Sequence, residues 1–66
     1  MTAKETAWKY MRFQLRGLKE YKDEYPQWKS LINLKEDKIK GAFEMANTLG
    51  LMTYEEYAAL RKSYGV

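Results

Sequence analysis

The sequence contains no cysteine and no histidine among its 66 residues. Without cysteine the chain forms neither a disulfide framework nor a thiolate metal site, and without histidine it lacks the commonest metal ligand and general base. These absences exclude zinc fingers and catalysis by serine–histidine or cysteine–histidine pairs. We therefore expect neither a metal nor a cofactor.

Long apolar runs are missing too. No segment approaches the roughly 20 consecutive apolar residues that cross a bilayer, and the N-terminus has no apolar block of the kind found in secretory signals. We therefore expect a cytoplasmic protein that makes no membrane contact.

The groups available for catalysis are limited to carboxylates, lysine, tyrosine and serine. The acidic residues are spread among basic neighbours, in or beside expected exposed helix turns, so none is expected to be buried enough for a shifted pKa. A chain of this size also leaves little room for a substrate pocket. We predict that the protein is not an enzyme.

The length sets a further limit. The chain of 66 residues has room for a single domain, residues 1–66, and such a chain hides only about 60% of the surface that its unfolded form exposes. Association with another chain is one way to supplement so thin a core.

Apolar residues spaced three and four positions apart predict three helices and no strand. The first helix begins near Ala3, after a capping box formed by Thr2 and Glu5, and runs to about Lys22. The second spans about residues 34–49 and the third about 54–64. The predicted fold class is therefore all-α, a small three-helix bundle. Its expected core is Trp8, Met11, Leu15, Leu18, Trp28, Ile32, Ile39, Phe43, Ala46, Leu49, Leu51, Tyr57 and Leu60.

The boundary between the first two helices allows more than one arrangement. Pro26 disfavours helical geometry at Tyr25 but suits the first turn of a new helix. A short extra helix over 26–32 is one arrangement, followed by a new start at Asn33, whose side chain with Glu36 has capping spacing. One unbroken helix from Pro26 is the other.

The segment 49–53 predicts a tight corner between the second and third helices. Gly50 can adopt the left-handed conformation that closes a helix, and Leu51 can then fold back onto its last turn. Thr53 and Glu56 form a capping box for the third helix. Met52 and Tyr57 have the spacing of a hydrophobic staple across it.

This corner also resembles part of the helix-turn-helix pattern, through Ala46, Gly50 and the helix opened by Thr53. The resemblance implies that the third helix enters the major groove of DNA. However, Glu55 and Glu56 occupy the turn that would face the phosphates, and phosphates repel carboxylates. We therefore expect a capped corner, with DNA binding as the alternative function.

The first helix carries a row of basic residues. Lys9, Arg12, Arg16 and Lys19 follow the apolar stripe one residue later, so they lie about 100° round the helix from it. Residues 1–22 hold six basic and two acidic residues, whereas the rest of the chain is nearly neutral. The row is either a solvated face or a contact with phosphates or an acidic protein surface.

Phe13 lies on the opposite side of this helix from the apolar stripe, with Tyr10 and Tyr21 nearby. A helix that is apolar on two sides is sandwiched in a core or has a second partner. Phe13 is therefore either covered by residues 26–32 or part of a binding patch, because aromatic residues beside arginine are enriched at interfaces.

Together these features predict a small non-enzymatic protein–protein interaction module. We expect it to regulate or inhibit a partner protein, or to self-associate, through its first helix. The predicted contact residues are Lys9, Tyr10, Arg12, Phe13, Arg16 and Lys19.

Overall fold

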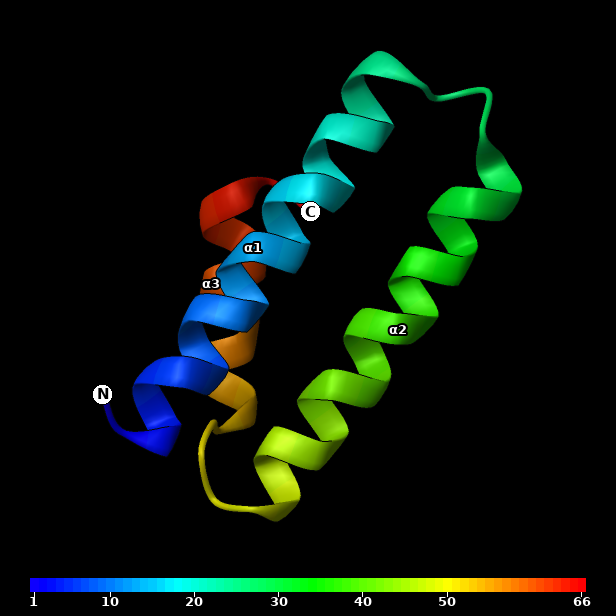
Figure 1. The fold of residues 1–66 in the computed structure, drawn as a ribbon. Coiled ribbons are helices and arrows are strands. Elements are labelled where there is room, and N and C mark those ends of the chain that lie inside the picture. The colour runs from blue at the N-terminus through cyan, green and yellow to red at the C-terminus, as the bar shows by residue number, and fades with distance from the viewer.

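The computed structural model describes all residues from 1 to 66 and contains three helices and no strand. The helices are α1 (Ala3–Glu24), α2 (Lys29–Thr48) and α3 (Tyr54–Tyr64). α1 and α2 run antiparallel, and α3 packs along α1 (Figure 1). This arrangement confirms the all-α three-helix bundle predicted from the sequence.

α1 is the central element because it contacts both of the other helices. Its first turn is capped as expected, since the Thr2 hydroxyl accepts a hydrogen bond from the Glu5 backbone N–H at 3.1 Å. Its apolar stripe provides much of the core. The buried apolar residues of the whole protein are Met11, Leu15, Leu18, Ile39, Ala46, Met52 and Tyr57.

The second helix is unbroken, as in one of the two expected arrangements, but it begins at Lys29 and not at Pro26. No separate helix forms over 26–32, and α2 begins at Lys29 and continues without a break through Asn33. The rings of Tyr25 and Trp28 stack with centroids 4.2 Å apart and an angle of 9° between their planes. The backbone N–H of Trp28 donates a hydrogen bond to the Tyr25 carbonyl at 2.9 Å. This local aromatic contact sets the start of α2, so the capping signal at Asn33 is not used.

Two residues of the predicted core are exposed, namely Trp28 and Leu49. Trp28 packs against Tyr21 and Tyr25 at the turn instead of entering the core. Leu49, the residue that follows α2, is left uncovered by the other helices and lines a surface groove. Both predictions were wrong because helical spacing does not show how far a neighbouring helix extends.

The corner at 49–53 has the predicted geometry. Gly50 adopts a φ of +73°, and the N–H groups of Leu51 and Gly50 donate to the carbonyls of Ala46 and Asn47 at 2.8 and 3.0 Å. This pair of bonds is a Schellman cap. The Asn47 side chain adds a hydrogen bond to the Met52 carbonyl at 3.0 Å, which ties the end of α2 to the start of α3.

The capping box of α3 is also formed. The Glu56 N–H donates to the Thr53 hydroxyl at 3.1 Å, and the Thr53 N–H donates to the Glu56 carboxylate at 2.9 Å. Lys4 lies 3.8 Å from the same carboxylate. Glu56 therefore fastens the first turn of α3 and faces the beginning of α1.

We expect the stability of the protein to depend on pH through Glu56. Its pKa lies below the ordinary value because the Thr53 backbone N–H donates to the carboxylate, with help from the Thr53 hydroxyl and Lys4. The charged form thus stabilises the fold above the ordinary glutamate pKa of about 4.3. This contribution is lost as the pH falls through the lower pKa of the folded state.

Urea unfolding of the wild type and of Glu56→Gln, each at about pH 7 and about pH 3, measures this effect. The stability difference between the two proteins should shrink at the lower pH. Glu55→Gln is the matched control, because the Glu55 side chain makes no hydrogen bond or ion pair. An equal response of both variants to pH would contradict the assignment to Glu56.

Candidate functional site: an aromatic and basic surface on α1

Phe13 is the most prominent apolar residue on the outer side of α1, with 66% of its surface exposed. Residues 26–32 do not fold back over it, because they form the turn and the first turn of α2. The alternative in which this segment covers Phe13 is therefore excluded. α1 is apolar on two sides, of which one enters the core and the other faces solvent.

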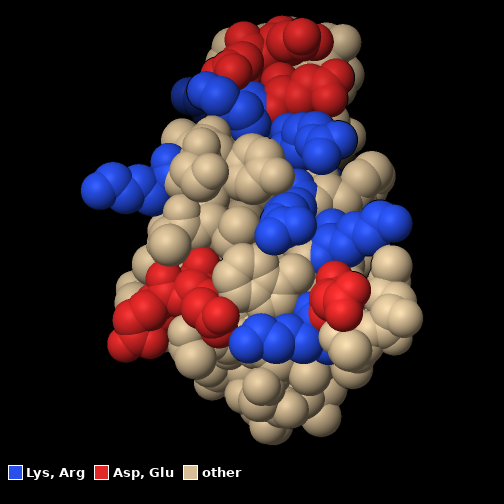
Figure 2. Space-filling model, turned by 90° about the vertical axis from the view of Figure 1, so that its left-hand side faces the viewer, with Lys and Arg blue, Asp and Glu red and all other residues tan.

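The basic row of α1 is exposed along its whole length. Figure 2 shows Lys and Arg side chains across the middle of the face formed by α1 and α3, with acidic side chains gathered at its upper end and further acidic side chains on both sides of its lower half. Lys19 pairs with Asp23 at 3.1 Å, and the Arg12 guanidinium lies 5.6 Å from the centre of the Trp8 ring. These two basic residues already have partners within the protein.

Lys9 and Arg16 differ from them because neither forms an ion pair or a cation–π contact. They lie four residues before and three residues after Phe13, so all three side chains are neighbours on the helix surface. α1 thus presents an exposed aromatic ring between two cations that have no acidic partner. Of the six predicted contact residues, these three are the most accessible to a binding partner.

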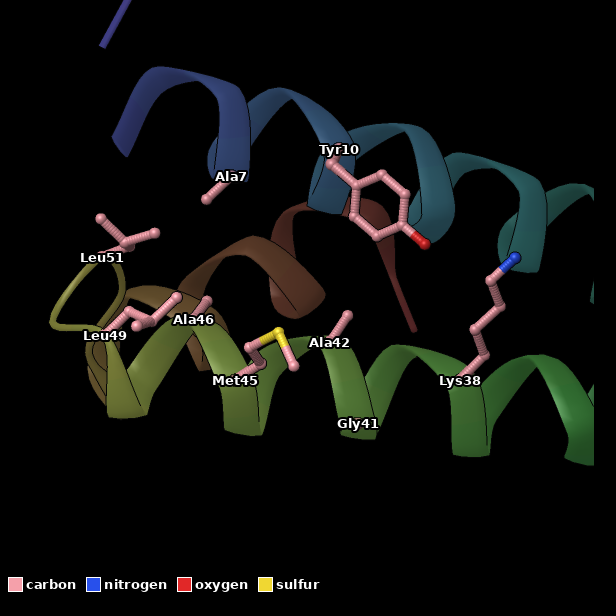
Figure 3. A pocket seen from close by; sticks show the side chains of 9 residues that line it. All are labelled: Ala7, Tyr10, Lys38, Gly41, Ala42, Met45, Ala46, Leu49 and Leu51. Atoms are coloured by element: carbon pink, nitrogen blue, oxygen red, sulfur yellow. The ribbon is translucent and has the colours of Figure 1, made fainter. Parts of the chain in front are cut away.

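Tyr10 has a different environment from Phe13. Its ring reaches across a groove of about 460 Å³ between α1 and α2 (Figure 3). α3 lies behind this groove in the same view, so the groove opens on the side of the molecule away from α3. The groove is lined by Ala7, Tyr10, Lys38, Gly41, Ala42, Met45, Ala46, Leu49 and Leu51.

Only Tyr10 of these lining residues was predicted as a contact residue. The others were missed because the groove arises from the pairing of α1 with α2. A sequence signal existed in α2, where Met45 and Leu49 are four residues apart and both strongly exposed. Their spacing places them on one side of the helix, next to the core side that contains Ile39 and Ala46.

The corner that resembles a helix-turn-helix uses its acidic residues within the fold. Glu56 caps α3 and lies near Lys4, while Glu55 remains exposed in the same first turn. Both carboxylates therefore stand at the end of α3 that would approach DNA in such a motif. Their charge stabilises the helix N-terminus.

No protein family model, no curated protein and no solved structure matches the chain. None of α1, α2 and α3 meets the length and hydropathy requirements of a membrane-spanning helix. No group of three acidic side chains lies close enough together to hold a metal ion.

Proposed function

We propose that the protein is a small non-enzymatic binding module that regulates or inhibits a partner protein through the outer surface of α1. The observation that carries the proposal is the exposed Phe13 ring between Lys9 and Arg16. Burying a phenylalanine side chain contributes about 1.5–3 kcal/mol, and this ring buries little of its surface within the fold. A partner would supply that burial together with acidic groups for the two cations.

The charge of the surface favours a different protein over a second copy of the same chain. Two copies meeting through α1 would bring Lys9 and Arg16 close to the same residues of the other copy, and like charges across an interface are costly. An acidic partner surface meets no such repulsion.

The proposal is tested with Phe13→Ala and with Tyr54→Ala as the matched control. Tyr54 is 67% exposed, almost the same as Phe13, but lies at the start of α3. We expect Phe13→Ala to weaken partner capture about 30-fold, as for a central interface residue worth about 2 kcal/mol. Tyr54→Ala should leave capture unchanged.

The measurement is capture from the native lysate with nuclease added, and circular dichroism confirms that each variant is folded. If Phe13→Ala and Arg16→Ala both bind as the wild type does, the proposal is wrong. If capture disappears with nuclease, falls steeply with added salt and depends on Tyr54, a DNA contact through α3 replaces it.

A further inference from the structure

The groove between α1 and α2 is a second apolar surface beside the proposed contact on α1. Tyr10 belongs to both, since its ring reaches over the groove and Phe13 follows it by one turn of α1. Seven of the nine lining residues are hydrophobic. What occupies such a groove can be inferred from its shape and charge.

The shape favours a helix as the occupant. An extended peptide binds by adding a strand to a sheet edge, and this protein has no sheet. Proline-rich peptides need a groove lined by several aromatic rings, and Tyr10 is the only aromatic side chain here. Between the larger side chains at its edges the groove is lined by small residues, which let a helix approach closely. These small residues are Ala7, Gly41, Ala42 and Ala46.

The length of the groove matches a short helix. Along α2 it extends from Lys38 to Leu49, which is about 17 Å at 1.5 Å per residue. A helix of about three turns covers this distance. Met45 lies near the middle of the α2 wall (Figure 3), and its unbranched side chain adapts to different apolar partners.

The charge of the groove favours an acidic flank on that helix. Lys38 is the one charged residue that lines the groove, and no carboxylate does. Leu49 and Leu51 form one end of the groove and Lys38 lies toward the other (Figure 3). One end of the groove is therefore apolar, and the other carries a single cation, Lys38.

We propose that this groove binds an amphipathic helix of the partner protein, with its apolar side between α1 and α2 and acidic residues beside Lys38. This inference rests on the proposed function, to which it adds the chemical class of the partner segment. The helix-in-groove mode gives the partner apolar anchors spaced three and four residues apart. The acidic residues decide which amphipathic helices bind.

The test is selection from a displayed library of helical peptides of about 14 residues, with leucine or methionine at helical spacing and all other positions randomised. Selection on the folded full chain should enrich Asp and Glu beside the apolar side. Met45→Glu should weaken binding of the enriched peptides at least about tenfold, because it places a carboxylate in the apolar wall. Tyr54→Glu, with a similarly exposed side chain on α3, is its control.

Charge reversal tests the acidic flank separately. Lys38→Glu should weaken binding of the acidic peptides about fivefold, whereas Lys40→Glu should not. Lys40 is two residues along α2 and thus about 200° round the helix, outside the groove. Failure to enrich any peptide over the Met45→Glu protein, or enrichment without acidic residues, would overturn the inference.

Two further results separate this inference from the proposed function. If partner capture is lost in Phe13→Ala but kept in Met45→Glu, the contact on α1 stands and the groove is not part of it. If Met45→Glu instead abolishes a concentration-dependent association of the free protein, the groove holds a second copy of this chain and the inference is overturned.

Discussion

Leu15→Ala is expected to lower the free energy of unfolding by about 3 kcal/mol. Leu15 is fully buried on α1, in the core cluster shared by all three helices. Its truncation removes apolar burial and leaves a cavity that the surrounding helices can close only in part. A single core of this size supplies about 3–5 kcal/mol in total, so the variant should retain no more than about 2 kcal/mol of that stability.

Urea unfolding followed by circular dichroism measures the change. Leu34→Ala is the matched control, since it makes the same substitution within a helix at a residue with 65% of its surface exposed. It should change the stability by no more than about 0.5 kcal/mol. Equal losses in the two variants would contradict the placement of Leu15 at the centre of the core.

Arg61→Ala is expected to cost about 2 kcal/mol, because one side chain joins three parts of the fold. Its guanidinium donates to the Glu36 carboxylate of α2 at 2.7 Å and to the Tyr57 hydroxyl at 2.9 Å. It also donates twice to a backbone oxygen of Val66, at 2.7 and 3.1 Å. Removing it leaves these acceptors without their donor.

The neighbouring residue Lys62 supplies the control, since it is exposed in the same turn of α3. Lys62→Ala should alter the stability little. Glu36→Gln then separates the charge from the hydrogen bonds, because it keeps the shape of the side chain. A loss in Arg61→Ala no larger than in Lys62→Ala would show that Arg61 does not hold α3 to α2.

The parts of the fold that followed from the sequence are those fixed by residues close together in the chain. Thr2, Gly50 and Thr53 each act on backbone groups within a few residues. The beginning of α1 and both sides of the corner were therefore predicted within a residue. The beginning of α2 was not predicted, because it depends on the stacking of Tyr25 on Trp28. That contact depends on the path of the turn, and no residue spacing in the sequence indicates it.

The candidate site likewise has features that the sequence predicts and features that depend on how the helices pack. A helical wheel placed Phe13 away from the core, and the choice between a covered and an exposed ring needed the path of residues 26–32. The groove was not predicted from the sequence, because Tyr10 and Met45 line the same groove only when α1 and α2 are packed together. Surfaces shared by two helices require the relative position of the helices.

The two tryptophans lie at opposite ends of the α1–α2 pair. The Trp8 indole N–H donates to the Leu51 carbonyl at 3.3 Å, beside the corner, whereas Trp28 stacks on Tyr25 at the turn between α1 and α2. The two indole rings therefore have different surroundings, so their fluorescence should differ in wavelength and in intensity. The tryptophan fluorescence of the protein can therefore report on two regions separately. Trp8 reports on the packing of the corner, and Trp28 reports on the turn between α1 and α2.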